Sequence, residues 1–90
     1  MATPAPRITV YRTTGCPYCV AAEQLLRRKD VAFDQIYLDD HPDRHDFVAS
    51  LKPGHCTVPL VLIDDEAIGG YDDLARLDRE GRLDALLAGD

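Results

Sequence analysis

Apolar residues first alternate with polar ones and then recur at helical spacing in the N-terminal half of the chain. The segment 8–11 alternates and is β-branched or aromatic, which predicts a strand. Thr13–Gly15 interrupts this pattern, and Pro17 suits the first turn of a helix, where its missing N–H is not needed. A helix is therefore expected from Pro17 to about Lys29. The residues that recur three and four apart, and so face the core, are Cys19, Ala22, Leu25 and Leu26.

The rest of the chain predicts a second strand and then a longer series of elements. Segment 31–38 carries Phe33 and a final apolar run, which is typical of a strand, so the first three elements form a β-α-β unit. We expect next a helix after Pro42 that ends at 52–54 and then a buried strand over 59–63. A turn over 64–66 should lead into a short strand over 67–68. The chain should end with a helix that is capped by Asp72 and runs through Leu77, followed by a last short helix over 83–87.

This order of elements implies an α/β fold with a four-stranded mixed β-sheet flanked by helices. With 90 residues, the chain has room for one hydrophobic core. We therefore expect a single domain over residues 1–90. Composition agrees, because 46% apolar and 29% charged residues are ordinary for a globular protein.

Charge and hydropathy exclude several classes of function. The formal net charge is −6, whereas binding to nucleic acid or to an anionic membrane needs a basic surface. No apolar run reaches the 18 or so residues of a membrane span. Segment 1–7 has no hydrophobic run, so it does not resemble a secretory signal. We expect a cytoplasmic monomer that binds neither nucleic acid nor membrane.

The chemistry of the chain centres on Cys16 and Cys19. Cys16 would lie just before the first helical turn, where free N–H groups and the helix dipole favour a thiolate. The thiolate is the nucleophile in disulfide exchange. Cys19 follows one turn later on the apolar stripe, so it should be less exposed. We therefore predict that Cys16 attacks and that Cys19 resolves the intermediate.

A metal site is the alternative interpretation of the same pair. Two cysteines separated by two residues also form half of a zinc site, and His55–Cys56 could supply the other half. A pair that follows a strand and opens a helix favours redox chemistry instead. We therefore predict no bound metal, and keep a zinc or iron–sulfur module on Cys16, Cys19 and Cys56 as the rival. Cys56 is otherwise a small loop residue or a third redox site.

Pro59 has two interpretations. One is the first position of a strand, where a proline is tolerated. The other is a cis-proline that exposes the backbone of Val58 to an extended thiol substrate. The sequence pattern by itself does not separate them.

Three motifs together resemble a dithiol glutaredoxin: Cys16-Pro-Tyr-Cys19, Thr57-Val58-Pro59, and Gly69-Gly-Tyr-Asp-Asp-Leu74. The resemblance covers about residues 7–88. It implies a thioredoxin-like fold with a cis-proline at position 59. It also implies glutathione as co-substrate with no tightly bound cofactor, and glutathionylated or disulfide-containing proteins as partners. The glutathione-binding residues that it implies are Tyr18, Arg44, Thr57, Val58, Pro59, Gly70, Tyr71, Asp72 and Asp73.

The chain departs from the family pattern before the first cysteine. Many glutaredoxins carry a lysine where this chain has Thr13. Arg12 is adjacent, but we expect it on the opposite face if the strand extends that far, so the helix dipole should provide most of the electrostatic support to the thiolate. The loop over 52–56 is similar to that of mycoredoxin-like proteins, which use mycothiol. A reductase that uses this other small thiol is therefore a further alternative.

Overall fold

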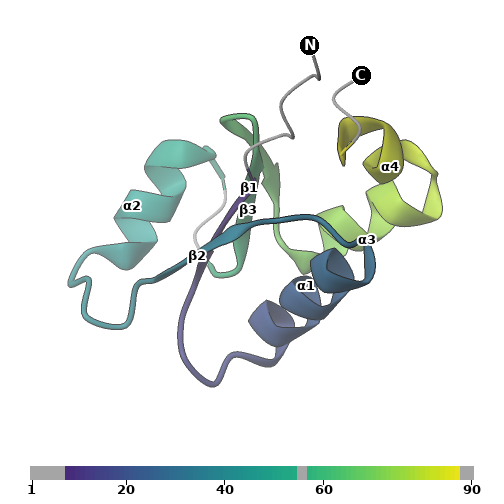
Figure 1. Ribbon diagram of the computed structural model, residues 1–90. Helices are drawn as coiled ribbons and strands as arrows, with labels where there is room; N and C mark the ends of the chain where they lie inside the picture. The colour runs from purple at the N-terminus through teal and green to yellow at the C-terminus, as the bar shows by residue number, and fades with distance from the viewer. Residues whose placement is uncertain (1–7, 55–56, 88–90) are drawn as a thin grey trace, which may run out of the picture.

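A computed structural model describes residues 8–54 and 57–87, and its strands form one mixed sheet (Figure 1). The strands are β1 (Ile8–Arg12), β2 (Asp34–Tyr37), β3 (Leu60–Ile63) and β4 (Glu66–Gly69). They lie in the order β2-β1-β3-β4. β1 pairs parallel with β2 and antiparallel with β3, and β3 pairs antiparallel with β4. The predicted four-stranded mixed sheet is confirmed.

Helices cover both faces of this sheet (Figure 1). They are α1 (Pro17–Arg28), α2 (Arg44–Leu51), α3 (Tyr71–Arg79) and α4 (Arg82–Leu87). On one face, α1, α3 and α4 bury Leu26, Leu74 and Leu83 against the strands. On the other face, α2 packs Val48 against Leu60 of β3 and Leu38. No helix within the described ranges has the length and apolar character needed to cross a membrane.

The α1 stripe expected from the sequence is the buried face of the helix. Cys19, Ala22, Leu25 and Leu26 are all buried. Each fully buried leucine contributes about 1.5–3 kcal/mol relative to an exposed one. Lys29, the C-cap of α1, joins the end of this helix to the C-terminal helices, because its Nζ lies 2.5 Å from Asp78 and 3.0 Å from Asp84. Packing and ion pairs therefore fix α1, and with it the Cys16–Cys19 segment, against the sheet.

The strands differ from the expected ranges at their ends. Val31 and Phe33 lie outside β2, although they still pack against the core on the α1 face. The chain reaches β2 through Asp30, whose φ of 57° ends the helical path. β3 begins after Pro59, because proline has no N–H to donate to the sheet. The expected strand over 31–38 was therefore too long at both ends, and the one over 59–63 was too long by one residue.

Candidate active site

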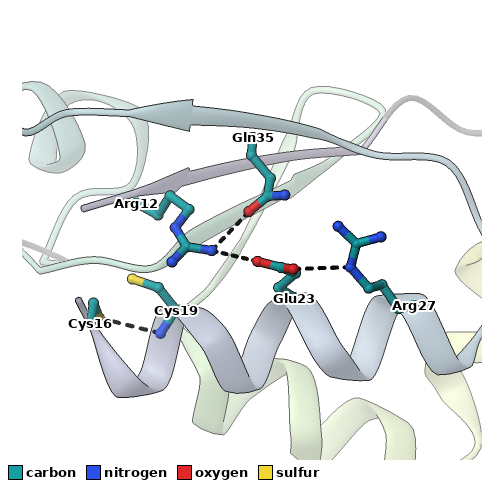
Figure 2. A network of polar contacts seen from close by, with 6 residues as sticks. All are labelled: Arg12, Cys16, Cys19, Glu23, Arg27 and Gln35. Atoms are coloured by element: carbon teal, nitrogen blue, oxygen red, sulfur yellow. Dashed lines mark hydrogen bonds and ion pairs between the residues drawn. The ribbon is translucent and has the colours of Figure 1, made fainter. Parts of the chain in front are cut away.

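Cys16 occupies the N-cap position of α1. Its backbone is extended, with φ −87° and ψ 113°, and Pro17 is the first helical residue. The backbone N–H of Cys19 donates a hydrogen bond to Cys16 Sγ at 3.2 Å (Figure 2). N–H groups in a first helical turn lack intrahelical partners and form the positive end of the helix dipole. This position favours a negatively charged sulfur at Cys16.

Cys19 lies one turn further along α1 and is fully buried, whereas Cys16 is partly exposed. Burial, the largest cause, and then the hydrogen bond with Cys16 raise the pKa of the Cys19 thiol from 9.0 to about 12. A backbone hydrogen bond from Thr13 and the charge of Arg12 act in the opposite direction and lower this pKa. The two cysteines therefore differ in exposure as the sequence predicts, with a protonated Cys19 beside an accessible Cys16 at neutral pH.

An open pocket of about 300 Å³ borders the segment between the two cysteines. Its walls come from three parts of the chain: the first turn of α1, the loop before β3, and the start of α3. The lining residues are Tyr18, Thr57, Val58, Pro59, Gly70, Tyr71, Asp72 and Asp73. The structure thus brings together eight of the nine residues that the sequence assigned to binding a small thiol.

Tyr18 and Tyr71 both line this pocket, and their rings are close to each other. Their ring centroids are 6.4 Å apart, and Tyr18 is 62% exposed. The Val58–Pro59 peptide bond is cis, which confirms the cis-proline expected at position 59, whereas pairing of the Val58 backbone with a thiol substrate stays a prediction. An exposed ring beside the cis-proline segment can hold a peptide-like ligand of small size.

The N-terminus of α3 faces the same pocket. Gly70 is the N-cap, and its backbone N–H donates to Asp73 Oδ2 at 3.1 Å. The predicted capping by Asp72 is therefore wrong, because the carboxylate that bonds the cap residue belongs to Asp73. Asp72 stays exposed at the pocket edge. The first turn of a helix offers N–H groups to a carboxylate ligand.

A glycine at position 69 is required by this arrangement. Its φ is +128°, which side-chain-bearing residues rarely adopt. A Cβ built on Gly69 would lie 2.3 Å from Asp73 Oδ2. The glycine therefore lets Asp73 approach the backbone closely enough to bond Gly70.

Arg44 does not join this group. It is the first residue of α2, the helix on the other face of the sheet, and it is not among the residues that line the pocket. Its assignment to a ligand carboxylate stays a prediction. His55 and Cys56 lie outside the described residues. Within the described part of the chain, no group of three or more His, Cys, Asp or Glu side chains could hold a metal ion.

Arg12 is the site residue that sequence reasoning misplaced. It belongs to β1 and is only 4% exposed, on the face where Ile8 and Val10 pack against α1. Its Nη1 lies 2.7 Å from Glu23 Oε1 and 2.8 Å from Gln35 Oε1 (Figure 2). The expectation that Arg12 points away from the cysteines is wrong, because β1 continues through position 12 and its period of two directs this side chain toward α1.

Glu23 connects this buried arginine to the surface. Its second oxygen accepts from Arg27 Nε at 2.9 Å, one turn further along α1. The hydrogen bond from Arg27 and then that from Arg12 lower the pKa of Glu23, against the opposing effect of burial. Glu23 is therefore a carboxylate at neutral pH. The alternation of Ile8, Val10 and Arg12 was the signal that could have revealed the network from the sequence.

Comparison with known proteins gives consistent results. Residues 8–68 match the family model of glutaredoxin. A glutaredoxin of Pseudomonas aeruginosa is 46% identical over 83 residues, which are 92% of this chain and 98% of the relative.

Solved structures agree with these relatives. The structure of a buckwheat glutaredoxin–glutathione complex superposes with a TM-score of 0.83 at 30% identity, over 93% of this chain and 78% of the other. A dithiolic glutaredoxin of Trypanosoma brucei brucei gives a TM-score of 0.79 at 33% identity, over 97% of this chain and 99% of the other. The expected thioredoxin-like fold is confirmed, and the family match favours redox chemistry over the zinc or iron–sulfur alternative.

Proposed function

The chain belongs to the glutaredoxin family of thiol–disulfide oxidoreductases, and from this premise we propose that glutathione is its co-substrate. Its substrates would be protein–glutathione mixed disulfides and protein disulfides. We propose that residues 1–90 act as a single cytoplasmic domain and as a monomer, with no tightly bound cofactor.

In the proposed reaction, the Cys16 thiolate attacks the glutathione sulfur of a mixed disulfide. The protein substrate leaves as a thiolate and takes up a proton, and glutathione remains bonded to Cys16. The thiolate of a second glutathione then attacks the sulfur of the bound glutathione. Glutathione disulfide forms and Cys16 is released as a thiolate. For a protein disulfide, the Cys16 thiolate attacks one substrate sulfur and releases the other as a thiolate that takes up a proton. Cys19, as a thiolate, then attacks the Cys16 sulfur, the Cys16–Cys19 disulfide forms, and the substrate leaves with its second thiol reduced.

The pocket beside the cysteines is the observation that carries this proposal. Val58, next to the cis-proline, would pair through its backbone with the cysteinyl part of glutathione. The N–H groups at the start of α3 suit its γ-glutamyl carboxylate, and the exposed carboxylate of Asp72 suits its amine. The buckwheat relative was solved as a glutathione complex at 30% identity. These features support glutathione as the ligand of this pocket.

Two variants test the reaction on a glutathione mixed disulfide in a coupled assay. Cys16→Ser should abolish activity, because the remaining thiol of the pair, Cys19, is buried and its raised pKa keeps it protonated. Cys19→Ser should keep substantial activity, because the reaction with glutathione needs one thiol. Equal loss in both variants would contradict the single-thiol step.

The identity of the small thiol is tested with a matched pair of substrates. The wild-type protein should reduce the glutathione mixed disulfide with glutathione faster than the mycothiol mixed disulfide with mycothiol. The reverse order would assign the chain to mycoredoxin-like chemistry. Both outcomes use the same protein and differ only in the thiol supplied.

A further inference from the structure

A buried arginine lies beside the second cysteine. Arg12 ends β1 on the face that packs against α1, and it is 4% exposed. Figure 2 shows the Cys19 side chain leaving the first turn of α1 on the side of the helix that faces the Arg12 guanidinium. A cation in a dry interior is unfavourable unless it meets negative charge or hydrogen-bond acceptors. The groups around the Arg12 guanidinium therefore show which negative charges and acceptors compensate for its burial.

Three side chains hold the guanidinium in place. Glu23 and Gln35 both accept from Nη1, at 2.7 Å and 2.8 Å. The guanidinium carbon also lies 4.9 Å from the ring centroid of Tyr37, the residue paired with Arg12 across β1 and β2. Elements on both sides of Arg12 thus restrict its position. A cation fixed in this way needs little reorganisation when a neighbouring group gains charge.

One donor of Arg12 remains unused. Its Nε is buried and has no hydrogen-bond partner among the described residues. Buried N–H groups are nearly always paired, and an unpaired one costs roughly 1–3 kcal/mol. Cys19 is the neighbouring group that changes charge during dithiol chemistry. As a thiolate it would offer this cation a negative partner, which the neutral thiol does not.

We propose that Arg12 is a positioning residue that stabilises the thiolate of Cys19 during closure and opening of the Cys16–Cys19 disulfide. The proposal rests on the dithiol branch of the proposed function. In closure, the Cys19 thiol gives up its proton and the resulting thiolate attacks the Cys16 sulfur of a mixed disulfide. The Cys16–Cys19 bond forms, the bond from Cys16 to the substrate breaks, and the substrate leaves with the electron pair and takes up a proton. In opening, Cys19 is the thiolate that leaves.

The charges around Cys19 are consistent with this role. Burial and the sulfur of Cys16 disfavour its thiolate, whereas a backbone hydrogen bond from Thr13 and then the charge of Arg12 favour it. Glu23 opposes the effect of Arg12, but Arg27 holds its second oxygen toward the surface. The charged and titratable groups facing Cys19 are thus Cys16 and Arg12, with Glu23 behind Arg12. Arg12 is the cation in this set, so its removal should affect Cys19 directly.

Dithionitrobenzoate separates the two thiol steps in one experiment. All variants carry Cys56→Ser, and one equivalent of reagent is mixed with reduced protein. Attack by Cys16 releases a first thionitrobenzoate in a second-order phase. Attack by Cys19 then releases a second one in a concentration-independent phase. Both phases are followed by absorbance, and neither requires glutathione.

Arg12→Met should slow the second phase about three- to tenfold at pH 7. Loss of about one pKa unit of thiolate stabilisation lowers the thiolate fraction about tenfold, and the more basic thiolate that remains attacks somewhat faster. The first phase should stay within about twofold, because Arg12 does not contact Cys16. Arg12→Lys should restore much of the second phase, because it keeps the charge. Glu23→Gln should accelerate it, because the opposing charge is gone. Arg28→Met, at an exposed arginine of the same helix, is the matched control and should leave both phases unchanged.

Two results would overturn the proposal. An unchanged second phase in Arg12→Met would show that the arginine has no effect on Cys19. Equal slowing in Arg12→Met and Arg12→Lys would show that packing, and not charge, is responsible. The glutathione assay on Cys19→Ser judges the proposed function separately. If that assay fails while the second phase responds to Arg12, glutathione use is wrong and the role of Arg12 stands.

Discussion

The difference in burial between the two cysteines predicts a large difference in their reactivity toward an alkylating agent. The comparison uses two variants that each keep only one of the three cysteines. Cys16→Ser and Cys19→Ser are each combined with Cys56→Ser, so that the first protein reports on Cys19 alone and the second on Cys16 alone. The reagent is iodoacetamide, which reacts with thiolates and not with thiols.

The size of the effect follows from the pKa of Cys19. Its rise from 9.0 to about 12 spans three pH units, so the thiolate fraction at pH 7 falls about a thousandfold. Cys16→Ser removes two of the causes that raise this pKa, the hydrogen bond and the charge of Cys16. Burial is the largest cause, and it remains. We therefore expect Cys19 to react between about tenfold and a thousandfold more slowly than the same thiol in the unfolded chain.

The assay is mass spectrometry of samples quenched at increasing times, with the same variants unfolded in guanidinium as controls. In the folded protein, Cys16 should react at least as fast as in the unfolded chain, because it is partly exposed at a helix N-terminus. The rate for Cys19 should rise about tenfold per pH unit from pH 7 to 9 without a plateau. Reaction of folded Cys19 at the unfolded rate, or a plateau near pH 9, would refute the assigned difference between the thiols.

Two further predictions concern stability. Leu26→Ala should lower the free energy of unfolding by about 2–5 kcal/mol in urea denaturation, because Leu26 is fully buried between α1 and the sheet; a loss below 1 kcal/mol would contradict its place in the core. Gly69→Ala should cost about 1–3 kcal/mol and weaken glutathione binding in calorimetry, because its Cβ would displace Asp73 from the N–H of Gly70. Gly81→Ala, also at positive φ but with open space around it, should leave binding unchanged.

The hydrophobic pattern predicted the elements well where one face of an element is buried. The helical spacing of apolar residues in α1 predicted which side chains meet the sheet. The four predicted residues are the buried ones of this helix: Cys19, Ala22, Leu25 and Leu26. β2 was predicted less well because it is an edge strand, where Ile36 and Tyr37 remain 42% and 52% exposed. Its apolar residues therefore do not mark the bounds of a buried strand. Val31 and Phe33 were assigned to it because packing beside a helix and pairing in a sheet produce the same apolar signal.

The pocket was predictable because its residues lie in short motifs whose order along the chain is informative. The cis state of Pro59 followed from resemblance and not from composition, since both isomers fit a strand start. Arg44, in contrast, lies on α2 and is not among the residues that line the pocket. A position in a helix gives no information on which face of the sheet that helix covers, and α2 lies opposite α1 and α3.

Arg12 shows why a buried charge is hard to predict from sequence. Arginines are rarely buried unless paired, so an arginine in a strand is expected to be exposed when no partner can be seen in the sequence. The partners that allow Arg12 to be buried, Glu23 and Gln35, are 11 and 23 positions away in the sequence. They meet Arg12 only when α1 packs on β1 and β2. With Thr13 at the position where many relatives carry a lysine, the nearby positive charge lies beside Cys19 and not before Cys16. On the proposal above, the helix N-terminus then supports the attacking thiolate and Arg12 supports the resolving one. Exchanging the two residues, Arg12→Thr with Thr13→Lys, should therefore slow disulfide closure while leaving the single-thiol reaction intact.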